Sequence, residues 1–227
     1  MKIAMLLRWL RAKTLPFKSG WLKKVCRRLA KSPQGSPLSR LLIAHLALAW
    51  GNIGFAAGLS YLRHVGRRTR MTEGTILECG SGATTLLVAA LTERKGNPFV
   101  VFEHNLEWYH YMRELLGRLG FTHVKLVYAP LIDYGQYCWY SVPDDLQTDP
   151  FSLVICDGPP GNNPGGRYGL LPAMQQRLAQ DCVILLDDSH RPAERRIIDI
   201  WRRRRCIQAN RIGRFGTHTE LLFCRNS

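Results

Sequence analysis

The feature that most constrains the fold is an alternation of short apolar runs with amphipathic stretches, which begins at Thr75. Runs rich in β-branched and aromatic residues predict strands, and the stretches between them, with apolar residues at helical spacing, predict helices. The predicted strands are 75–79, 99–103, 124–128, 151–156, 182–187, 206–212 and 219–224, and the predicted helices are 84–94, 106–119, 167–179 and 192–204. This order indicates a parallel sheet with helices on both faces, closed by an antiparallel pair at one edge.

The basic residues divide the chain into two parts. The 32 Lys and Arg exceed the 17 Asp and Glu, giving a formal charge of +15, and no acidic residue precedes Glu73. The 17 basic residues after that point balance the 17 acidic ones, so the 15 in residues 1–72 carry the excess. We therefore predict a basic arm and linker over 1–37, which ends in SPQGSP, a helical lead-in over 38–72, and a near-neutral domain over 73–227.

The basic arm has apolar residues among its Lys and Arg, which predicts amphipathic helices broken near Pro16 and Gly20. A solvated, partly disordered arm is the alternative. Such an arm suits anionic lipid, phosphates or an acidic partner, and residues 1–31 are the part expected to reach an anionic membrane surface. The run 41–62 has the length of a membrane span, but its polar residues and glycines favour a packed helix pair or an interfacial segment.

Seven cysteines occur without any Cys-x-x-Cys pair, and three of them lie in apolar runs, which argues against a disulfide framework or a zinc site. No cleavable signal sequence is evident at the start of the chain. We expect a cytoplasmic protein, peripheral at the inner membrane surface if the arm binds lipid.

Polar residues follow the first two predicted strands, at the edge of a parallel sheet where ligands bind. The first is followed by a Gly80-Ser81-Gly82 turn, in which backbone can approach a ligand closely. Glu103 ends the second strand, where a carboxylate can accept both hydroxyl hydrogens of a ribose. Thr85 stands where a nicotinamide-binding fold has a third glycine, and the acidic Glu78 suits a cationic ligand better than a pyrophosphate.

With these residues the chain resembles the class I S-adenosylmethionine-dependent methyltransferases, and bacterial O-methyltransferase-like members in particular. The matching pieces are ECGSGATTLL, FEHNLEWY, DGPPG, RYGLLP and CVILLDDSHR, spread over residues 73–225. The resemblance implies a doubly wound, Rossmann-like α/β sheet of seven strands in the order 3-2-1-4-5-7-6, behind a basic helical N-terminal extension. It also implies S-adenosylmethionine binding by Glu78, Gly80, Gly82, Thr84, Glu103, His104, Pro130, Leu131 and Asp157, with Ala129 to Leu131 lining the adenine.

Three carboxylates follow the fourth and fifth predicted strands: Asp157, Asp187 and Asp188. Clustered carboxylates repel one another unless a proton or cation lies among them, and their hard oxygens suit Mg²⁺. Metal-dependent O-methyltransferases acting on sugars resemble this layout. The alternative is structural, with Asp188 and Ser189 capping the next helix and Asp187 bonding to backbone. Catalytic roles are predicted for Asp157, Asp188 and His190, although a histidine in such a loop is more often solvated.

The acceptor is expected to be a small molecule or glycan with a hydroxyl group, so that the product is an O-methyl ether. Arg167, Tyr168 and Arg191 are placed to hold an acidic or hydroxylated substrate. The DGPPG segment lacks the aromatic residue that amine-methylating enzymes carry after two prolines, which disfavours a flipped base. Two alternatives stay open: an RNA methyltransferase that uses the basic arm, and a non-catalytic membrane-associated adaptor with the same fold.

Overall fold

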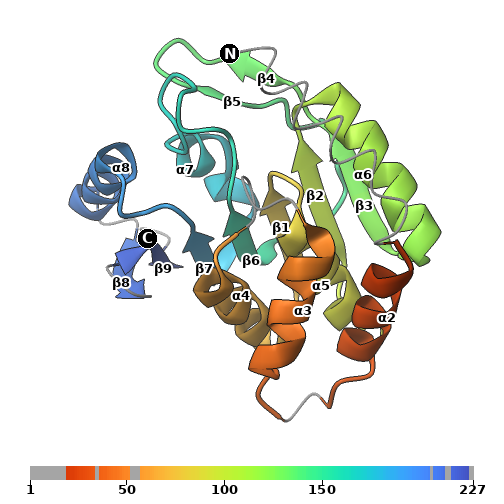
Figure 1. Ribbon diagram of the computed structural model, residues 1–227. Coiled ribbons are helices and arrows are strands. Elements are labelled where there is room, and N and C mark those ends of the chain that lie inside the picture. The colour runs from red at the N-terminus through yellow and green to blue at the C-terminus, as the bar shows by residue number, and fades with distance from the viewer. Residues whose placement is uncertain (1–18, 34–35, 52–56, 205–206, 213–215, 225–227) are drawn as a thin grey trace.

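The computed structural model describes residues 19–33, 36–51, 57–204, 207–212 and 216–224. A seven-stranded mixed sheet in the order β3-β2-β1-β6-β7-β9-β8 forms the centre of the molecule (Figure 1). The strands are β1 (Thr75–Cys79), β2 (Phe99–Glu103), β3 (Val124–Tyr128), β6 (Phe151–Cys156), β7 (Leu178–Leu186), β8 (Ile207–Ile212) and β9 (His218–Phe223). Counted without the strands of a separate hairpin, this is the predicted order, and the doubly wound fold is confirmed.

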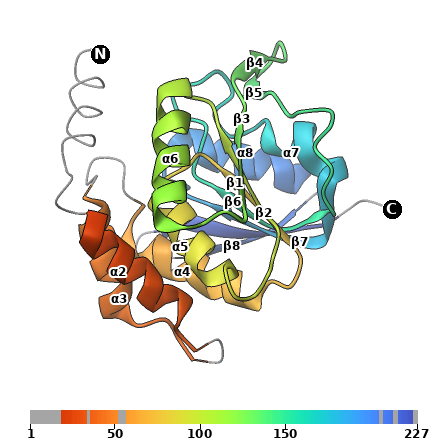
Figure 2. The ribbon, with the colours of Figure 1, turned by 90° about the vertical axis from the view of Figure 1, so that its right-hand side faces the viewer.

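Helices cover both faces of the sheet (Figure 2). One core lies beneath α2 (Ser19–Ala30), α3 (Arg40–Trp50), α4 (Leu59–Met71), α5 (Ala83–Thr92) and α6 (Leu106–Leu119). The other lies beneath α7 (Leu170–Met174), the short 3-10 helix η2 (Gln175–Arg177) and α8 (Pro192–Arg203). The central strands β1, β2 and β6 are buried almost throughout, as their nearly continuous apolar sequences require.

A two-stranded antiparallel hairpin, which the sequence did not predict, follows β3. It consists of β4 (Leu131–Asp133) and β5 (Cys138–Tyr140), and it lies at the top of the molecule in both ribbon views. Its second strand is anchored by Trp139 and Tyr140, which are fully buried. The hairpin therefore brings two large aromatic side chains to the carboxyl edge of the sheet.

The predicted helix 167–179 is wrong in its extent. Only Leu170–Met174 is α-helical, and β7 already begins at Leu178, where it pairs with Phe151 of β6. A register shift follows, and Asp181 adopts a positive φ of 61° there. Residues that the helical pattern assigned to the end of this helix are part of β7 instead. As a strand they can form backbone hydrogen bonds to the neighbouring strand β6, which satisfies their buried N–H and C=O groups.

The N-terminal segment is built into the domain over its described part. Helix α2 begins at Ser19, and it buries Leu22, Val25, Cys26 and Leu29 against the core. Of the two alternatives for the arm, the helix is therefore present over residues 19–30 and the solvated segment is not. The break predicted near Pro16 lies outside the described residues, and Gly20 lies at the first turn of α2. The run 41–62 forms α3 and α4 in place of one long helix, and no described helix is long and apolar enough to cross a membrane.

Candidate active site at the carboxyl edge of the sheet

The strand ends that the sequence singled out lie side by side. In the parallel register Cys79 of β1 is opposite Phe102 of β2 and Cys156 of β6, and Cys156 is opposite Leu186 of β7. The loops that follow these strands therefore share one edge of the sheet. Two backbone hydrogen bonds join the end of β1 to the loop after β6. The Asp157 and Gly158 N–H groups both donate to the Cys79 carbonyl, at 3.1 and 2.7 Å.

The two glycines of the first loop have different roles. Gly80 has a φ of +88°, and a Cβ there would lie 3.1 Å from the backbone nitrogen of Gly158, so the loops can approach only because it is glycine. A Cβ on Gly82 would meet no atom within 4 Å. Gly82 is therefore not required by packing, and the space in front of it is open to a ligand.

Glu78 precedes this loop as the penultimate residue of β1, and its side chain is fully buried. The Thr84 hydroxyl donates a hydrogen bond to Oε1, while Oε2 makes no hydrogen bond to any described residue. Burial raises the pKa of the Glu78 carboxyl to about 8, although hydrogen bonds from Thr84 and Thr85 oppose the shift. A buried carboxyl with an unused oxygen suits a positively charged ligand group, which would favour its ionised form.

Glu103 ends β2 and is nearly as buried, but it is well provided with donors. Oε2 accepts hydrogen bonds from the Ser81 N–H at 3.0 Å and the Ser81 hydroxyl at 2.7 Å, and Oε1 accepts one from the Asn105 N–H at 2.9 Å. The His104 Nδ1 lies 3.3 Å from Oε1, an ion-pair contact without hydrogen-bond alignment. Burial alone would raise the pKa, but interactions with His104, Asn105 and Ser81 outweigh it and hold the pKa below its usual range.

The segment predicted to line an adenine lies beside Glu103. The Ala129 N–H donates to the Glu103 carbonyl at 2.8 Å, which fixes the turn after β3. Ala129 is buried and Leu131 packs against the core, whereas Pro130 is exposed. The structure thus brings these predicted residues to the carboxyl edge of the sheet.

The three aspartates predicted as metal ligands also come together. One carboxylate oxygen from each of Asp157, Asp187 and Asp188 lies within 4.8 Å of the others. Burial raises the pKa of the Asp157 carboxyl, and for Asp187 burial together with the charges of Asp157 and Asp188 raises the pKa to about 7. The raised pKa of Asp187 follows from its burial beside two other carboxylates.

Arg167 is the residue whose role the sequence did not foresee. It is 1% exposed, and its guanidinium lies among the three aspartates. Nη2 lies 3.4 Å from Asp157 Oδ1 and 3.2 Å from Asp188 Oδ2, and it also donates to the Asp157 carbonyl at 2.5 Å, while Nη1 donates to the Asp187 carbonyl. Arg167 was predicted to hold the substrate, but it is committed to the ends of β6 and β7.

The helix-cap alternative for Asp188 and Ser189 is wrong. Helix α8 has Arg191 at its N-cap position and no side chain capping it. Asp188 instead accepts ion-pair contacts from Arg167 and from Arg191, the latter at 3.0 Å. Ser189 donates to the Gly216 carbonyl at 3.2 Å and accepts from the Thr219 hydroxyl at 2.7 Å, so it links the turn to β9. His190 is exposed beside these residues.

Tyr140 is a further residue that the sequence did not single out. It is fully buried at the end of the hairpin, and its hydroxyl makes no hydrogen bond to any described residue. A Cβ on Gly158 would collide with this hydroxyl, which places Tyr140 between the two glycine loops. The sequence pattern gave no sign that residue 140 is buried, because each strand of the hairpin has only three residues, which is too short for an alternation to be recognised.

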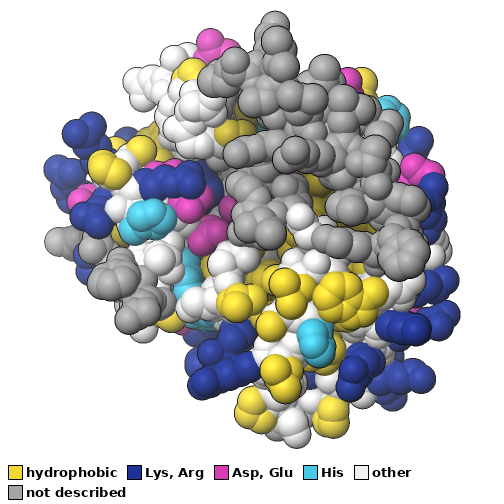
Figure 3. All heavy atoms as spheres, viewed as in Figure 1, with side chains coloured by type: hydrophobic (Ala, Val, Ile, Leu, Met, Phe, Trp, Pro, Cys, Tyr) yellow, Lys and Arg dark blue, Asp and Glu magenta, His cyan; other side chains and the backbone are white. Residues whose placement is uncertain are grey.

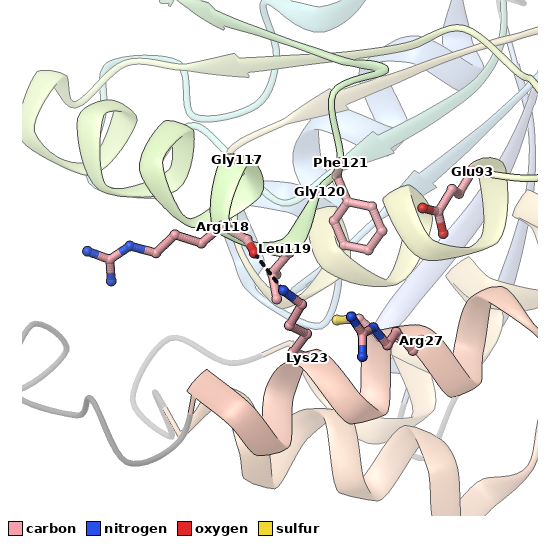
Figure 4. A pocket seen from close by; sticks show the side chains of 9 residues that line it. Lys23, Arg27, Glu93, Gly117, Arg118, Leu119, Gly120 and Phe121 are labelled. Carbon is pink, nitrogen blue, oxygen red and sulfur yellow. Dashed lines mark hydrogen bonds between the residues drawn. The ribbon is translucent and has the colours of Figure 1, made fainter.

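A cavity among the described residues lies away from this edge. It measures about 410 Å³ and lies between α2 and the segments that precede β2 and β3. Figure 4 shows Lys23, Arg27, Glu93 and Phe121 around it, with Lys23 Nζ donating to the Arg118 carbonyl at 3.4 Å. It is at the amino ends of the strands, so it belongs to the docking of α2 and not to the candidate active site.

No protein-family model matches the chain, and no curated protein matches it in sequence. Solved structures do match its fold. An O-methyltransferase from Bacillus cereus in complex with S-adenosylhomocysteine has a TM-score of 0.59 at 12% identity, covering 80% of this chain and 90% of that one. The O-methyltransferase TomG from Streptomyces achromogenes, in complex with S-adenosylmethionine, has a TM-score of 0.58 at 16% identity, covering 81% and 89%.

A methyltransferase from Podospora anserina, PaMTH1, also bound to S-adenosylhomocysteine, has a TM-score of 0.57 at 17% identity and covers 89% of this chain and 94% of that one. These matches extend over most of the chain and agree with the strand order described above. The chain therefore has the fold of the class I S-adenosylmethionine-dependent methyltransferases.

Proposed function

We propose that this protein is an S-adenosylmethionine-dependent methyltransferase that forms an O-methyl ether on a hydroxylated acceptor such as a saccharide. The observation that carries the proposal is a loop with open space at Gly82 between two buried carboxylates. Glu78, which precedes the loop, has an oxygen without a partner among the described residues, and ionised Glu103 accepts hydrogen bonds from Ser81 within the loop. A cation and a ribose are the two ligand groups that such carboxylates suit.

The ligand would lie across the first two strand ends. Gly80 and Gly82 would border its methionine part, Glu78 would face the ammonium side, and Glu103 would accept the ribose hydroxyl hydrogens. The segment 129–131 would contact the adenine. The Tyr140 hydroxyl, buried between the glycine loops without a partner, would complete the pocket near the methionine part.

Asp187 is the residue best suited to take the proton of the acceptor hydroxyl, because the pKa of its carboxyl is near 7. The cofactor supplies a methyl group bonded to a sulfonium. The chain's own part in the transfer would be to hold the acceptor hydroxyl beside Asp187, whose carboxylate would accept the hydroxyl proton. The remaining contribution of the chain is alignment, with Asp157 and Asp188 held in place by Arg167.

The arrangement does not fit the Mg²⁺ that the sequence suggested. A guanidinium already supplies positive charge between Asp157 and Asp188, and it is buried with further hydrogen bonds to two carbonyls. A divalent ion on the same oxygens would have to displace it or lie against its charge. We therefore expect methyl transfer to proceed in the presence of a chelator. Loss of turnover in chelator, with recovery on adding Mg²⁺, would instead restore the metal site.

The proposal is tested first by calorimetry with S-adenosylmethionine and S-adenosylhomocysteine. Both should bind, and Glu103→Ala should weaken both by about 1.5–3 kcal/mol, because charged hydrogen bonds to the ribose are lost. Since Glu103 also orders Ser81, Ser81→Ala serves as the control for loop disorder alone. Unchanged affinity in Glu103→Ala would reject the cofactor site.

The acceptor class is tested with labelled methyl groups. Transfer to polysaccharide or glycolipid fractions of a lysate, in a linkage that survives mild alkali, is expected for an O-methyl ether. Label that appears only in RNA, and that is lost with rising salt, would favour the RNA alternative. Cofactor binding without any transfer would favour the non-catalytic adaptor.

A further inference from the structure

Helix α3 is apolar on two faces, only one of which is packed. Ile43, Leu46 and Trp50 lie in the core. On the other side Leu41 is 72% exposed and Leu48 is 57% exposed, and their spacing of seven residues places them on one stripe. A helix that is apolar all round is ordinarily buried or in contact with lipid, so the exposed stripe indicates a surface that something covers.

Helix α2 extends this surface and adds charge to it. Trp21 is 39% exposed, and its ring lies 6.2 Å from that of His45, which occupies α3 between Leu41 and Leu48. A shallow pocket of about 330 Å³ opens here, lined by Trp21, Lys24, Val25, Arg27, Arg28 and His45. Figure 3 shows apolar side chains gathered over this region with a histidine among them and Lys and Arg side chains around them.

The charge around the surface has one sign. The exposed basic residues on and between the two helices are Lys24, Arg27, Arg28, Lys31 and Arg40. No acidic residue occurs anywhere in the first 72 residues, so nothing within these helices neutralises them. An apolar centre with an aromatic residue and a basic rim is the composition of interfacial helices that bind anionic lipid.

We propose that the face formed by Trp21, Leu41, His45 and Leu48, with its basic rim, docks the protein on an anionic membrane surface. Leu41, Leu48 and Trp21 would enter the boundary between headgroups and acyl chains, and the Lys and Arg residues would pair with lipid phosphates. A nucleic acid would use the basic rim but would gain little from exposed leucines, because its outer surface is a charged backbone. The proposal does not depend on the methyl-transfer reaction.

Docking in this way would orient the active site. Helices α2 and α3 lie at the far end of the molecule from the β4–β5 hairpin in both ribbon views (Figures 1 and 2). The hairpin follows the carboxyl end of β3, on the same edge as the candidate active site. Figure 3, drawn from the same side as Figure 1, shows the apolar surface turned toward the viewer, so the edge that carries the site lies to the side of the docking surface and not opposite it.

The experiment measures binding of the full chain to vesicles of phosphatidylcholine alone and of roughly three parts phosphatidylcholine to one part phosphatidylglycerol. We expect binding to the anionic vesicles only. Leu41→Glu/Leu48→Glu should weaken it at least about tenfold, because two apolar contacts become charges that the surface repels. Lys24→Gln/Arg28→Gln should weaken it about fivefold per residue, an effect that salt diminishes.

Ile132→Glu is the matched control, since Ile132 is 43% exposed on the hairpin at the opposite end. It should bind vesicles as the unmodified chain does. Thermal unfolding and cofactor binding of each variant show that the fold is intact and separate failure of docking from failure of the proposed enzyme function. Vesicle binding that survives Leu41→Glu/Leu48→Glu would overturn the proposal. Loss in the charge variant alone would point to a polyanion or an acidic protein in place of lipid.

Discussion

At the scale of single residues, Gly80 and Gly82 separate a folding requirement from a binding requirement. Gly82→Val should abolish cofactor binding and leave the thermal transition nearly unchanged, because its side chain would enter open space. Gly80→Val should lower the transition temperature, since it forces a φ of +88° on a β-branched residue and crowds Gly158. Calorimetry and thermal unfolding of both variants check this. Destabilisation by Gly82→Val equal to that by Gly80→Val would make both glycines structural.

Glu78 should make cofactor affinity depend on pH. Burial holds the pKa of this carboxyl at about 8 in the free protein, so it is mostly protonated at neutral pH. A cationic ligand favours the ionised form, and binding therefore releases a proton. Affinity for S-adenosylmethionine should rise by up to about tenfold per pH unit from pH 6 and level off above pH 8.

Calorimetry across this pH range, repeated in buffers of different ionisation enthalpy, measures the proton release directly. Glu78→Gln keeps the shape of the side chain but removes the titration, so its affinity should vary little with pH. An unmodified chain whose affinity is flat between pH 6 and 8 would show that Glu78 does not meet the cationic part of the ligand.

At the scale of elements, α2 is a structural helix as well as part of a docking face. Leu29 is fully buried where α2 packs, so Leu29→Ala should lower the free energy of unfolding by about 2–5 kcal/mol. Leu41→Ala, which removes the same atoms from an exposed position, should change it by less than about 0.5 kcal/mol. Urea unfolding compares the two, and equal effects would contradict the packing of α2 described above.

Arg167 connects the ends of β6 and β7 through hydrogen bonds to the Asp157 and Asp187 carbonyls. Arg167→Met should destabilise the protein by about 2–4 kcal/mol, because it leaves two partly buried carboxylates without the buried guanidinium that supplies their counter-charge. Arg191→Met is the control. Its guanidinium contacts the same Asp188 carboxylate but is half-exposed, so the cost should stay below about 1 kcal/mol. A cost for Arg167→Met as small as that would show that the ion pairs do not hold these strand ends together.

At the scale of the whole molecule, the beginning and the end of the domain are tied through a buried polar group. Arg68 and His64 of α4 both contact the Glu220 carboxylate of β9, and His64 Nδ1 lies 3.2 Å from His218 Nε2. The Tyr61 hydroxyl adds a hydrogen bond to the Leu185 carbonyl at 2.9 Å. The helical lead-in before residue 73 is thus joined to β7 and to the last strand, β9, by contacts more than 120 residues apart in sequence.

This group should make the fold sensitive to acid. Burial, with the nearby charge of His64, lowers the pKa of His218 to about 4, below its value in the unfolded chain. Between pH 6.5 and 4 the unfolded state therefore binds a proton that the folded state does not, and the free energy of unfolding falls as pH decreases. Urea unfolding against pH should show this slope, diminished in His218→Gln and retained in the exposed control His190→Gln. An undiminished slope in His218→Gln would place the acid sensitivity elsewhere.

The sequence by itself determined the seven strands of the large sheet, their order by resemblance, and the polar strand ends after residues 79, 103 and 156. These depend on local properties, namely apolar periodicity, glycine turns and a carboxylate directly after a strand, which are readable wherever the strand is long and buried. The prediction of a helix over 167–179 was wrong at its end, because Leu178 pairs with Phe151 of β6 as part of a strand. Such pairing depends on a neighbouring strand that the local sequence does not reveal.

Only the tertiary structure decided what surrounds the three aspartates. From sequence they were metal ligands or a helix cap, but the cation among them is Arg167, which lies 10 residues from Asp157 and 21 from Asp188 along the chain. It likewise decided that Tyr140 lies between the glycine loops and that one face of α3 is covered while the other is exposed. The physical reason is common to all three, since a buried charge or an apolar stripe is satisfied by partners distant in sequence, which packing alone brings together.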